Sequence, residues 1–444
     1  MTAAGALPRI LTIMGSGETT PTMSRVHRAV LERLGERPVP AVVLDTPYGF
    51  QENANDITAK ALDYFRVSVG TQFSVASFLS ADVDLLTRET AFLRIRDARL
   101  VFTGPGSPSY ALRQWAGTDI PRLLAAKLAD GGAVTMASAA ALTLGRYTIP
   151  VYEIYKVGEA PRWLPGLDLL TALGLPVAVV PHYDNAEGGN HDTRFCYLGE
   201  RRLRVLEAEL PPEAFILGVD GHTALVLDLD AGLASVVGLG TVTVRKDGRS
   251  TVFAAGTQLA IGELVAAARE PGTPRSAAGV ASTGGTSAGG AGDSAVTVVP
   301  GASVGVLEEV PASRPLREEV ATLERVFAAS LDECDAAAAV RAILTLDETI
   351  QAWAGDTDQS DALTVARAAL RAAIVSLGEM AEQGTRDPRE LIAPFVDALL
   401  TERVRARTAR EWSAADAIRD RLVAAGIELH DSADGTTWEL RPVG

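Results

Sequence analysis

The chain has 444 residues, of which 47% are hydrophobic and 22% charged, and its formal net charge at pH 7 is −15. This length is too great for one ordinary domain, and the composition is that of a globular protein. No apolar run approaches the roughly 18 residues that a membrane-spanning helix needs, so no membrane partner is expected. The acidic net charge excludes nonspecific nucleic-acid binding by the whole surface, and any RNA site must therefore be local.

The first residues carry no basic segment typical of a signal peptide, and we expect the apolar stretch at 10–14 to be a buried strand of a cytoplasmic protein. Cys196 and Cys334 are far apart in the sequence, so neither a disulfide framework nor a cysteine metal site is expected. The chain has no P-loop, no dinucleotide fingerprint and no HExxH motif. The sequence therefore predicts no cofactor and no metal.

In chain order, short apolar runs alternate with helical patterns from residue 10 to residue 228. Buried runs of four to seven residues separated by helices are typical of a mostly parallel sheet covered on both faces. The sequence predicts a doubly wound α/β domain of flavodoxin-like type over residues 8–268. The expected strands are 10–14, 41–46, 73–78, 98–104, 133–138, 177–183, 215–220 and 223–228, and the expected helices are 22–35, 53–66 and 108–129.

Residues 269–313 are rich in Gly, Ser, Ala and Thr and nearly free of large apolar side chains. Such a segment cannot bury enough surface to offset its ordering entropy, which predicts a flexible linker. Residues 314–444 then show Ala-, Leu-, Glu- and Arg-rich helical periodicity, typical of a helical bundle. The bundle is followed by a small β-hairpin over 427–442, with its turn at Asp434-Gly435.

Chemistry-bearing residues follow three of the predicted strands, where reactive groups collect in open α/β sheets. The run AVTMA leads to Ser138 and then directly into a helical pattern, which would expose the serine on a sharp turn. Met136 and Ala140 stand where glycine usually relieves crowding at such a turn, and a serine here is also a common helix N-cap. His182 follows the run VAVV, as a general base or as a satisfied structural histidine. The turn at 104–108 either points N–H groups at an oxyanion or simply reverses the chain.

One ordered set of motifs runs through the α/β region: GSGE (15–18), GPGSPSYAL (104–112), SAAA (138–141), GLDLL (166–170), PHYDN (181–185) and LGVDGHTALVLD (217–228). By these motifs, residues 8–265 resemble the peptidase family that contains aspartyl dipeptidase E and cyanophycinase. The resemblance implies a fold similar to class I glutamine amidotransferases and a serine, histidine and acid triad. Glutaminase activity is not expected, because it needs a cysteine where this chain has Ser138.

Carried over to this sequence, the resemblance implies that Ser138 is the nucleophile and His182 the general base. The backbone N–H groups of Gly106 and Ala139 would form the oxyanion hole.

The acidic member of the triad has several candidates. Glu153 lies at the spacing after the serine where the dipeptidase has its acid, although it could instead be a structural acid paired with Lys156. Asp184 and Asp220 are the rivals. Gly221 stands where cyanophycinases have a glutamate, and the dipeptidase's substrate loop is absent, so neither specificity is carried over.

From Phe395 to Pro442 the sequence resembles the C-terminal end of bacterial cysteinyl-tRNA synthetases, and the helices from about residue 316 fit that enzyme's bundle more loosely. The resemblance implies that four residues contact an anticodon: Arg407, Trp412, Asp416 and Asp431.

The residue types support such a site. Arg403, Arg407 and Arg410 follow helical spacing and can form one basic ridge toward phosphate, while Trp412 offers a stacking face. In the alternative interpretation the charged residues form a solvated helix face, and Trp412 and Trp438 cap a small core.

Two functions remain open on sequence alone. The first is a serine hydrolase of a peptide or amide bond, fused to a tRNA-binding module. The second is a catalytically inactive binding protein whose C-terminal module docks tRNA or a protein. The motifs do not indicate an oligomeric state.

Overall fold

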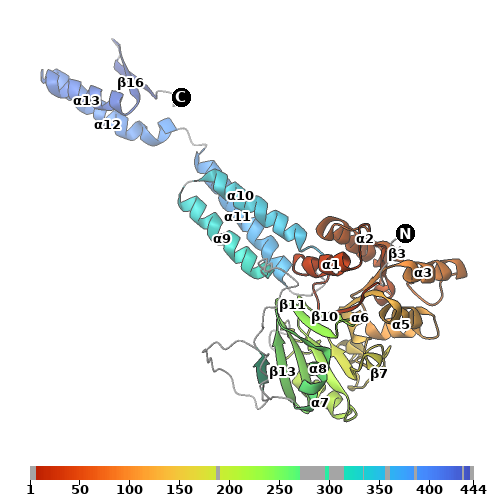
Figure 1. The fold of residues 1–444 in the computed structure, drawn as a ribbon. Helices are drawn as coiled ribbons and strands as arrows, with labels where there is room; N and C mark the ends of the chain where they lie inside the picture. The colour runs from red at the N-terminus through yellow and green to blue at the C-terminus, as the bar shows by residue number, and fades with distance from the viewer. Residues whose placement is uncertain are drawn as a thin grey trace. The chain divides into compact units, whose positions relative to one another are not determined.

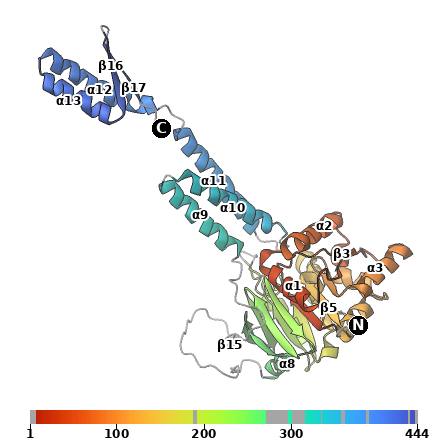
Figure 2. The ribbon, with the colours of Figure 1, turned by 45° about the horizontal axis from the view of Figure 1, so that its top comes forward.

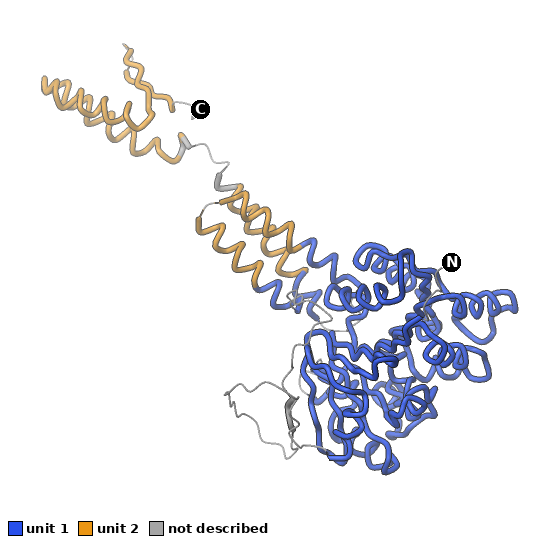
Figure 3. Tube along the Cα trace, in the orientation of Figure 1, with its two compact units in different colours: residues 1–321, 347–366 blue, residues 322–346, 367–444 orange. Residues whose placement is uncertain are grey.

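The computed structural model describes residues 7–186, 191–270, 296–299, 315–333, 335–355, 361–384, 388–432 and 435–440. Two compact units divide the chain, as Figure 3 shows. The first comprises Met1–Ala321 with Asp347–Ala366, and the second comprises Thr322–Leu346 with Arg367–Gly444.

A central sheet of eight described strands organises the first unit: β1 (Arg9–Met14), β2 (Ala41–Leu44), β3 (Ser74–Ala76), β4 (Leu100–Thr103), β5 (Gly132–Ala137), β10 (Thr223–Asp228), β11 (Leu233–Gly238) and β14 (Gln258–Ala260). Their order is β14-β11-β10-β1-β5-β4-β2-β3. The five strands from β1 to β3 pair in parallel, whereas β10, β11 and β14 add antiparallel pairs at one side. The predicted mostly parallel α/β sheet is confirmed.

Helices cover both faces of this sheet (Figure 1): α1 (Pro21–Arg33), α2 (Ala54–Tyr64), α3 (Leu85–Asp97), α4 (Pro108–Trp115) and α5 (Ile120–Asp130). Side chains alternate between the faces of a strand. Along β1, Ile10 and Met14 pack into one apolar core with residues of α1, whereas Leu11 and Ile13 pack into another with residues of α3 and α5. This double burial explains why the strands read as continuous apolar runs.

The prediction of a single helix at 108–129 is wrong. The structure has two helices there, because α4 ends at Trp115 and α5 begins only at Ile120. Gly117 lies between them with φ +71°, a left-handed conformation that glycine adopts easily at a helix end. Pro121 then fits the first turn of α5, where no backbone donor is needed.

A second sheet contains β8 (Val177–Val180), β9 (Phe215–Val219), β12 (Thr241–Lys246), β13 (Arg249–Ala254) and β15 (Val296–Val299). Its order is β15-β13-β12-β9-β8, with β15 at the edge (Figure 2). Helix α7 (Gly199–Ala208) packs Leu203 and Leu206 into one core with Val180 and Ile216. Sequence analysis expected one sheet, so the separation of β8 and β9 from the central sheet is a new feature.

The predicted linker at 269–313 falls mostly on residues outside the described ranges. Within it, β15 pairs in parallel with β13, with Ser250 opposite Val296.

The helical region contains α9 (Leu316–Asp332), α10 (Ala336–Ala352), α11 (Ala362–Gly384), α12 (Pro388–Thr408) and α13 (Trp412–Ala424), followed by β16 (Ile427–Ser432) and β17 (Gly435–Leu440). The two strands pair antiparallel, so the predicted bundle and terminal hairpin are confirmed. Asp434 of the predicted turn lies outside the described residues. In the second unit, α12, α13 and the hairpin share a small core of Val396, Leu400, Leu422, Ile427 and Leu429, with Trp438 packed against it.

Candidate functional site

Ser138 lies on a sharp turn between β5 and the short helix α6 (Ser138–Leu142). Its backbone φ is +49°, a left-handed conformation that costs a non-glycine residue about 1 kcal/mol or more. Its side chain does not cap the helix, because the N-cap residue is Ala137. Met136 and Ala140 are both fully buried, so the turn forms without the usual glycines.

His182 lies two residues beyond β8, and its backbone is also left-handed, with φ +47°. The Oγ of Ser138 is 2.9 Å from Nε2 of His182. The two side chains are therefore within hydrogen-bond reach, although they follow strands of two different sheets. A hydroxyl that donates to a neutral imidazole at this distance is arranged for proton transfer.

The loop after β1 leaves the sheet beside this pair. In the parallel pairing of β1 with β5, Met14 lies opposite Ala137, so the GSGE loop and Ser138 emerge side by side. Glu18 of that loop is fully buried, and its carbonyl oxygen is 2.8 Å from Nε2 of His27.

The turn after β4 lies against the serine turn, because the Ala140 N–H donates to the Gly104 carbonyl at 3.1 Å. Gly106 in this turn has φ +133°, and a Cβ added there would lie 2.1 Å from the Pro47 carbonyl oxygen. Only glycine fits this place. Among the described residues, neither the Gly106 nor the Ala139 N–H donates to a protein acceptor, which leaves both donors available to a ligand.

Glu153 begins a short helical turn, Glu153–Val157. Its Oε1 accepts a hydrogen bond of 2.5 Å from the Ser109 hydroxyl, which also lies 3.0 Å from the Ser107 hydroxyl. The second carboxylate oxygen is buried without a hydrogen-bond partner among the described residues. The predicted hydrogen bond from His182 to Glu153 is thus not formed in this structure.

The two rival acids, Asp184 and Asp220, accept hydrogen bonds from other residues. Asp184 accepts the Gly221 N–H at 2.7 Å, and Asp220 accepts both the N–H and the hydroxyl of Thr241 at 2.8 and 2.7 Å. Burial, reinforced by the charge of Asp184, raises the pKa of Asp220 to about 6. Asp220 is therefore partly protonated near neutral pH.

An aromatic pair that the sequence did not reveal flanks the histidine. The rings of Tyr155 and Tyr197 stack with centroids 5.1 Å apart, and the ring of Tyr197 lies 6.3 Å from that of His182. Tyr155 belongs to the same turn as Glu153. The two tyrosines are 42 positions apart in sequence, which is why no local pattern pointed to them.

In the second unit, Asp431 of the hairpin lies beside Arg407, so two of the four residues predicted to contact RNA are brought together. Arg403 bonds both carboxylate oxygens of Asp431 at 2.8 Å, while Arg407 and Arg419 approach the same carboxylate at 3.5 and 3.7 Å. The hydrogen bonds from Arg403 hold the pKa of Asp431 well below its usual range. Arg403 is only 3% exposed, so its predicted place on a phosphate-facing ridge is wrong.

The other predicted contacts are exposed. Trp412 is 59% exposed at the first residue of α13, and Asp416 is exposed one turn later on the same helix. Arg407 keeps about half of its side chain in solvent. Trp438 instead belongs to the core, with its Nε1 donating to Asp397 at 3.3 Å, so the two tryptophans have different roles.

The C-terminal segment matches a known domain. Residues 391–438 match the family model of the cysteinyl-tRNA ligase anticodon binding domain. The chain is 57% identical over 47 residues to a cysteine–tRNA ligase of Cereibacter sphaeroides, and 38% identical over 109 residues to one of Kocuria rhizophila. These alignments cover 11% and 22% of this chain, and the chain spans only 9% and 22% of the two ligases.

Two solved structures are similar to more than half of the chain. A peptidase from an acI-B1 actinobacterium is 20% identical with a TM-score of 0.46, covering 58% of this chain and 98% of its own. A putative peptidase E protein from Listeria monocytogenes is 13% identical with a TM-score of 0.35, covering 54% of this chain and 98% of its own.

Across the described ranges, no group of three or more His, Cys, Asp and Glu side chains is placed to hold a metal ion. None of the helices in that part of the chain is long and apolar enough to cross a membrane.

Proposed function

We propose that the α/β domain is a serine hydrolase of a peptide or amide bond, with Ser138 as nucleophile and His182 as general base. The observation that carries this proposal is the 2.9 Å contact between Ser138 Oγ and His182 Nε2, made by two residues that both have left-handed backbones. Strained conformations of this kind persist only where the surrounding structure imposes them, and they cluster at active sites.

The reaction follows from this geometry. Ser138 Oγ attacks the substrate carbonyl as its proton passes to His182 Nε2, and the N–H groups of Gly106 and Ala139 receive the oxyanion. His182 then gives the proton to the departing amine, which leaves an acyl group on Ser138. Water, deprotonated by His182, attacks the acyl group; the bond to Ser138 Oγ then breaks, His182 returns the proton to that oxygen, and the acid is released.

Glu153 remains the proposed acidic member. Its buried Oε2 would accept a hydrogen bond from the imidazolium, which requires a shift of the side chain from the position held by Ser109. Contacts of this kind are often loose before substrate binds. Asp184 and Asp220 stay rivals, although the loops of Gly221 and Thr241 already engage them.

Labelling with a fluorophosphonate tests the proposal, because this probe reacts only with an activated serine. We expect covalent labelling of the full-length protein that is lost in Ser138→Ala and strongly reduced in His182→Ala. If the native protein is not labelled, or if Ser138→Ala is labelled equally, the alternative of an inactive binding protein is favoured.

We also propose that the C-terminal module binds tRNA, and that the substrate is an aminoacyl or peptidyl group carried on such an RNA in the cytoplasm. The match of residues 391–438 to an anticodon-binding domain supports this, together with the exposed Trp412 and the half-exposed Arg407. Binding of full-length protein to tRNA-Cys and to an unrelated tRNA, measured at low salt, tests it. Equal and negligible binding would instead favour a protein-docking module.

A further inference from the structure

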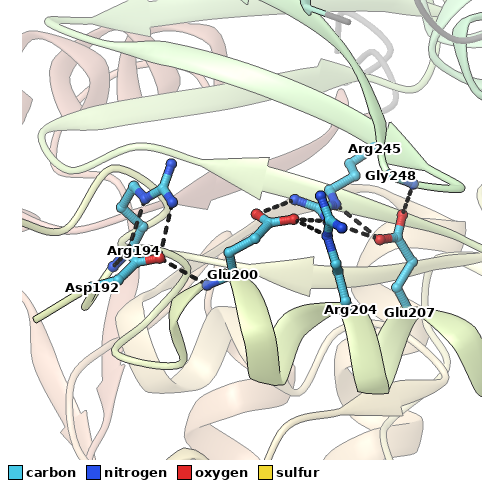
Figure 4. A network of polar contacts seen from close by, with 7 residues as sticks. All are labelled: Asp192, Arg194, Glu200, Arg204, Glu207, Arg245 and Gly248. Carbon is cyan, nitrogen blue, oxygen red and sulfur yellow. Dashed lines mark hydrogen bonds and ion pairs between the residues drawn. The ribbon is translucent and has the colours of Figure 1, made fainter. Parts of the chain in front are cut away.

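A network of charged side chains joins α7 to β12, as Figure 4 shows. Arg245 on β12 keeps only 4% of its side chain exposed. Its two terminal nitrogens bond both oxygens of Glu200 at 2.8 and 2.9 Å, and its Nε bonds Glu207 at 3.0 Å. Arg204 adds a bond of 2.7 Å to Glu200 from the exposed side of α7.

A buried arginine held by two carboxylates in this way is a rigid unit. Burying the charge of Arg245 away from water costs free energy. Removal of one of the two carboxylates would leave part of that buried positive charge uncompensated. The hydrogen bonds from Arg245 outweigh burial and hold the pKa of Glu200 at about 2, so the carboxylate stays ionised.

Glu200 also contacts the loop at 192–199. Its N–H donates to Asp192 at 2.9 Å, and Asp192 in turn bonds the Arg194 side chain at 2.8 and 2.9 Å. The Gly199 N–H donates to the Arg194 carbonyl at 2.9 Å and closes the loop at the start of α7. Figure 4 shows Asp192 and Arg194 beside Glu200.

The loop itself has a strained backbone. Phe195, Cys196 and Tyr197 are consecutive and have φ of +61°, +55° and +67°. Each non-glycine residue in this region costs about 1–2 kcal/mol, so the loop needs external support to persist. Part of the support is the Arg245 guanidinium, which lies 5.5 Å over the ring of Phe195.

This strained segment holds the backbone of the histidine. The Cys196 N–H donates to the His182 carbonyl at 3.0 Å, and the Phe195 N–H donates to the Tyr183 carbonyl at 2.9 Å. The two bonds fix the left-handed His182 in the conformation that presents Nε2 to Ser138.

We infer that Arg245 is a positioning residue for His182, acting through Glu200 and the loop at 192–199. Arg245 does not touch the reacting atoms. It fixes the direction of the imidazole, and with it the distance from Nε2 to Ser138 Oγ. The inference rests on the proposed hydrolase function, because only there does that distance have a chemical consequence.

Two substitutions on the same helix provide a matched test. Glu200→Gln and Glu207→Gln each remove one negative charge that faces Arg245, but Glu200 adjoins the loop, whereas Glu207 adjoins the β12–β13 turn through a 3.0 Å bond from the Gly248 N–H. The full-length variants are compared in the rate of fluorophosphonate labelling from about pH 5 to about pH 9. Titration of the His182 ring by NMR, assigned with His182→Ala among the five histidines, gives a second readout.

We expect Glu200→Gln to slow labelling at least about tenfold and to shift the pH profile and the His182 titration, because small misplacements of a catalytic group have large kinetic effects. Glu207→Gln, which keeps both bonds from Arg245 to Glu200, should slow labelling several-fold less than Glu200→Gln. Equal effects of the two variants, or no effect of either, would overturn the inference.

The failure of this inference is distinguishable from failure of the hydrolase proposal. If the native protein is not labelled, the hydrolase proposal fails, and an unchanged His182 titration in Glu200→Gln would separately refute the positioning role. Arg245→Lys serves if Glu200→Gln does not fold, since lysine keeps the charge but not the two-pronged contact. A folded Arg245→Lys protein with native labelling and native His182 titration would also overturn it.

Discussion

The serine site and the hairpin site hold their functional groups in opposite ways. Ser138 and His182 are set by backbones in left-handed conformations, supported by buried loops and buried charges. Trp412 and Arg407 stand on regular helices, and their side chains are largely in solvent. The geometry of Ser138 and His182 therefore depends on the fold around them. The exposed surface offered by Trp412 and Arg407 depends mainly on those two side chains.

This difference determines what a substitution does. A change beside a strained backbone alters both stability and geometry, because the strain persists only if the surroundings remain intact. A change at an exposed helix position leaves stability within about 0.5 kcal/mol and acts on binding alone.

Gly106→Ala should destabilise the protein most, by more than about 3 kcal/mol, because the added Cβ would lie 2.1 Å from the Pro47 carbonyl in a backbone at φ +133°. Urea unfolding of the full-length protein measures the effect. Gly117→Ala is the matched control, since Gly117 has φ +71° but no atom within 4 Å of an added Cβ. It should cost only about 1 kcal/mol. Similar costs for both would mean that the turn after β4 is less constrained than its contacts indicate.

Much of the fold was predictable because it follows from short-range patterns. Apolar runs marked β5 and β8, and Ser138 and His182 were expected at their ends for that reason. The assignment of β8 to a second sheet was not predictable, because an apolar run of four residues looks the same in either sheet. The Arg245 network was equally hidden, since its partners lie 38 and 45 positions away.

Arg403→Ala should destabilise the hairpin end of the second unit by about 2–3 kcal/mol, because it removes a buried, two-pronged bond to Asp431. Thermal unfolding checks this. Arg405→Ala is the control, because that side chain is 80% exposed and pairs only with Glu402 of its own helix among the described contacts. Its effect should be near zero. Equal unfolding temperatures of the Arg403→Ala and Arg405→Ala variants would show that Arg403 is dispensable for the fold.

The mistaken position of Arg403 illustrates a limit of sequence patterns. Helical spacing placed Arg403 and Arg407 on one face, which is correct, but spacing does not reveal the depth of that face. The hairpin brings Asp431 across α12 from 28 positions away and buries the first arginine. One arginine of the expected ridge therefore stabilises the fold, while Arg407 remains half-exposed.

Trp412→Ala should weaken binding to tRNA-Cys by about 1–3 kcal/mol while leaving the unfolding temperature unchanged, because the ring is 59% exposed and would stack on a base. Affinity should also fall with salt, since arginines meet phosphates. Filter binding or fluorescence anisotropy with the full-length protein measures both. If Trp412→Ala instead lowers the unfolding temperature and leaves the affinity for tRNA-Cys unchanged, Trp412 belongs to the core and not to a binding surface.

Asp220→Asn should have the smallest effect, an increase in stability of about 1 kcal/mol near pH 8 that vanishes near pH 4. Burial raises the pKa of Asp220 from 3.8 to about 6, so the folded protein binds a proton more tightly than the unfolded chain. The native protein therefore loses stability as pH rises from about 4 through 6. Asparagine removes the charge and can still accept from Thr241 at its amide oxygen.

His27 makes the stability of the protein change with pH in the opposite direction to Asp220. Burial lowers the pKa of His27 from 6.5 to about 4, so the unfolded chain binds the proton more tightly and stability rises with pH between about 4 and 6.5. In the native protein the two slopes partly cancel, whereas in Asp220→Asn the slope from His27 is no longer offset by Asp220. Urea unfolding of both proteins at about pH 4, 6 and 8 measures the difference. Parallel curves would mean that Asp220 has the same pKa in the folded and the unfolded protein, and that it is ionised near neutral pH as a rival to Glu153 must be.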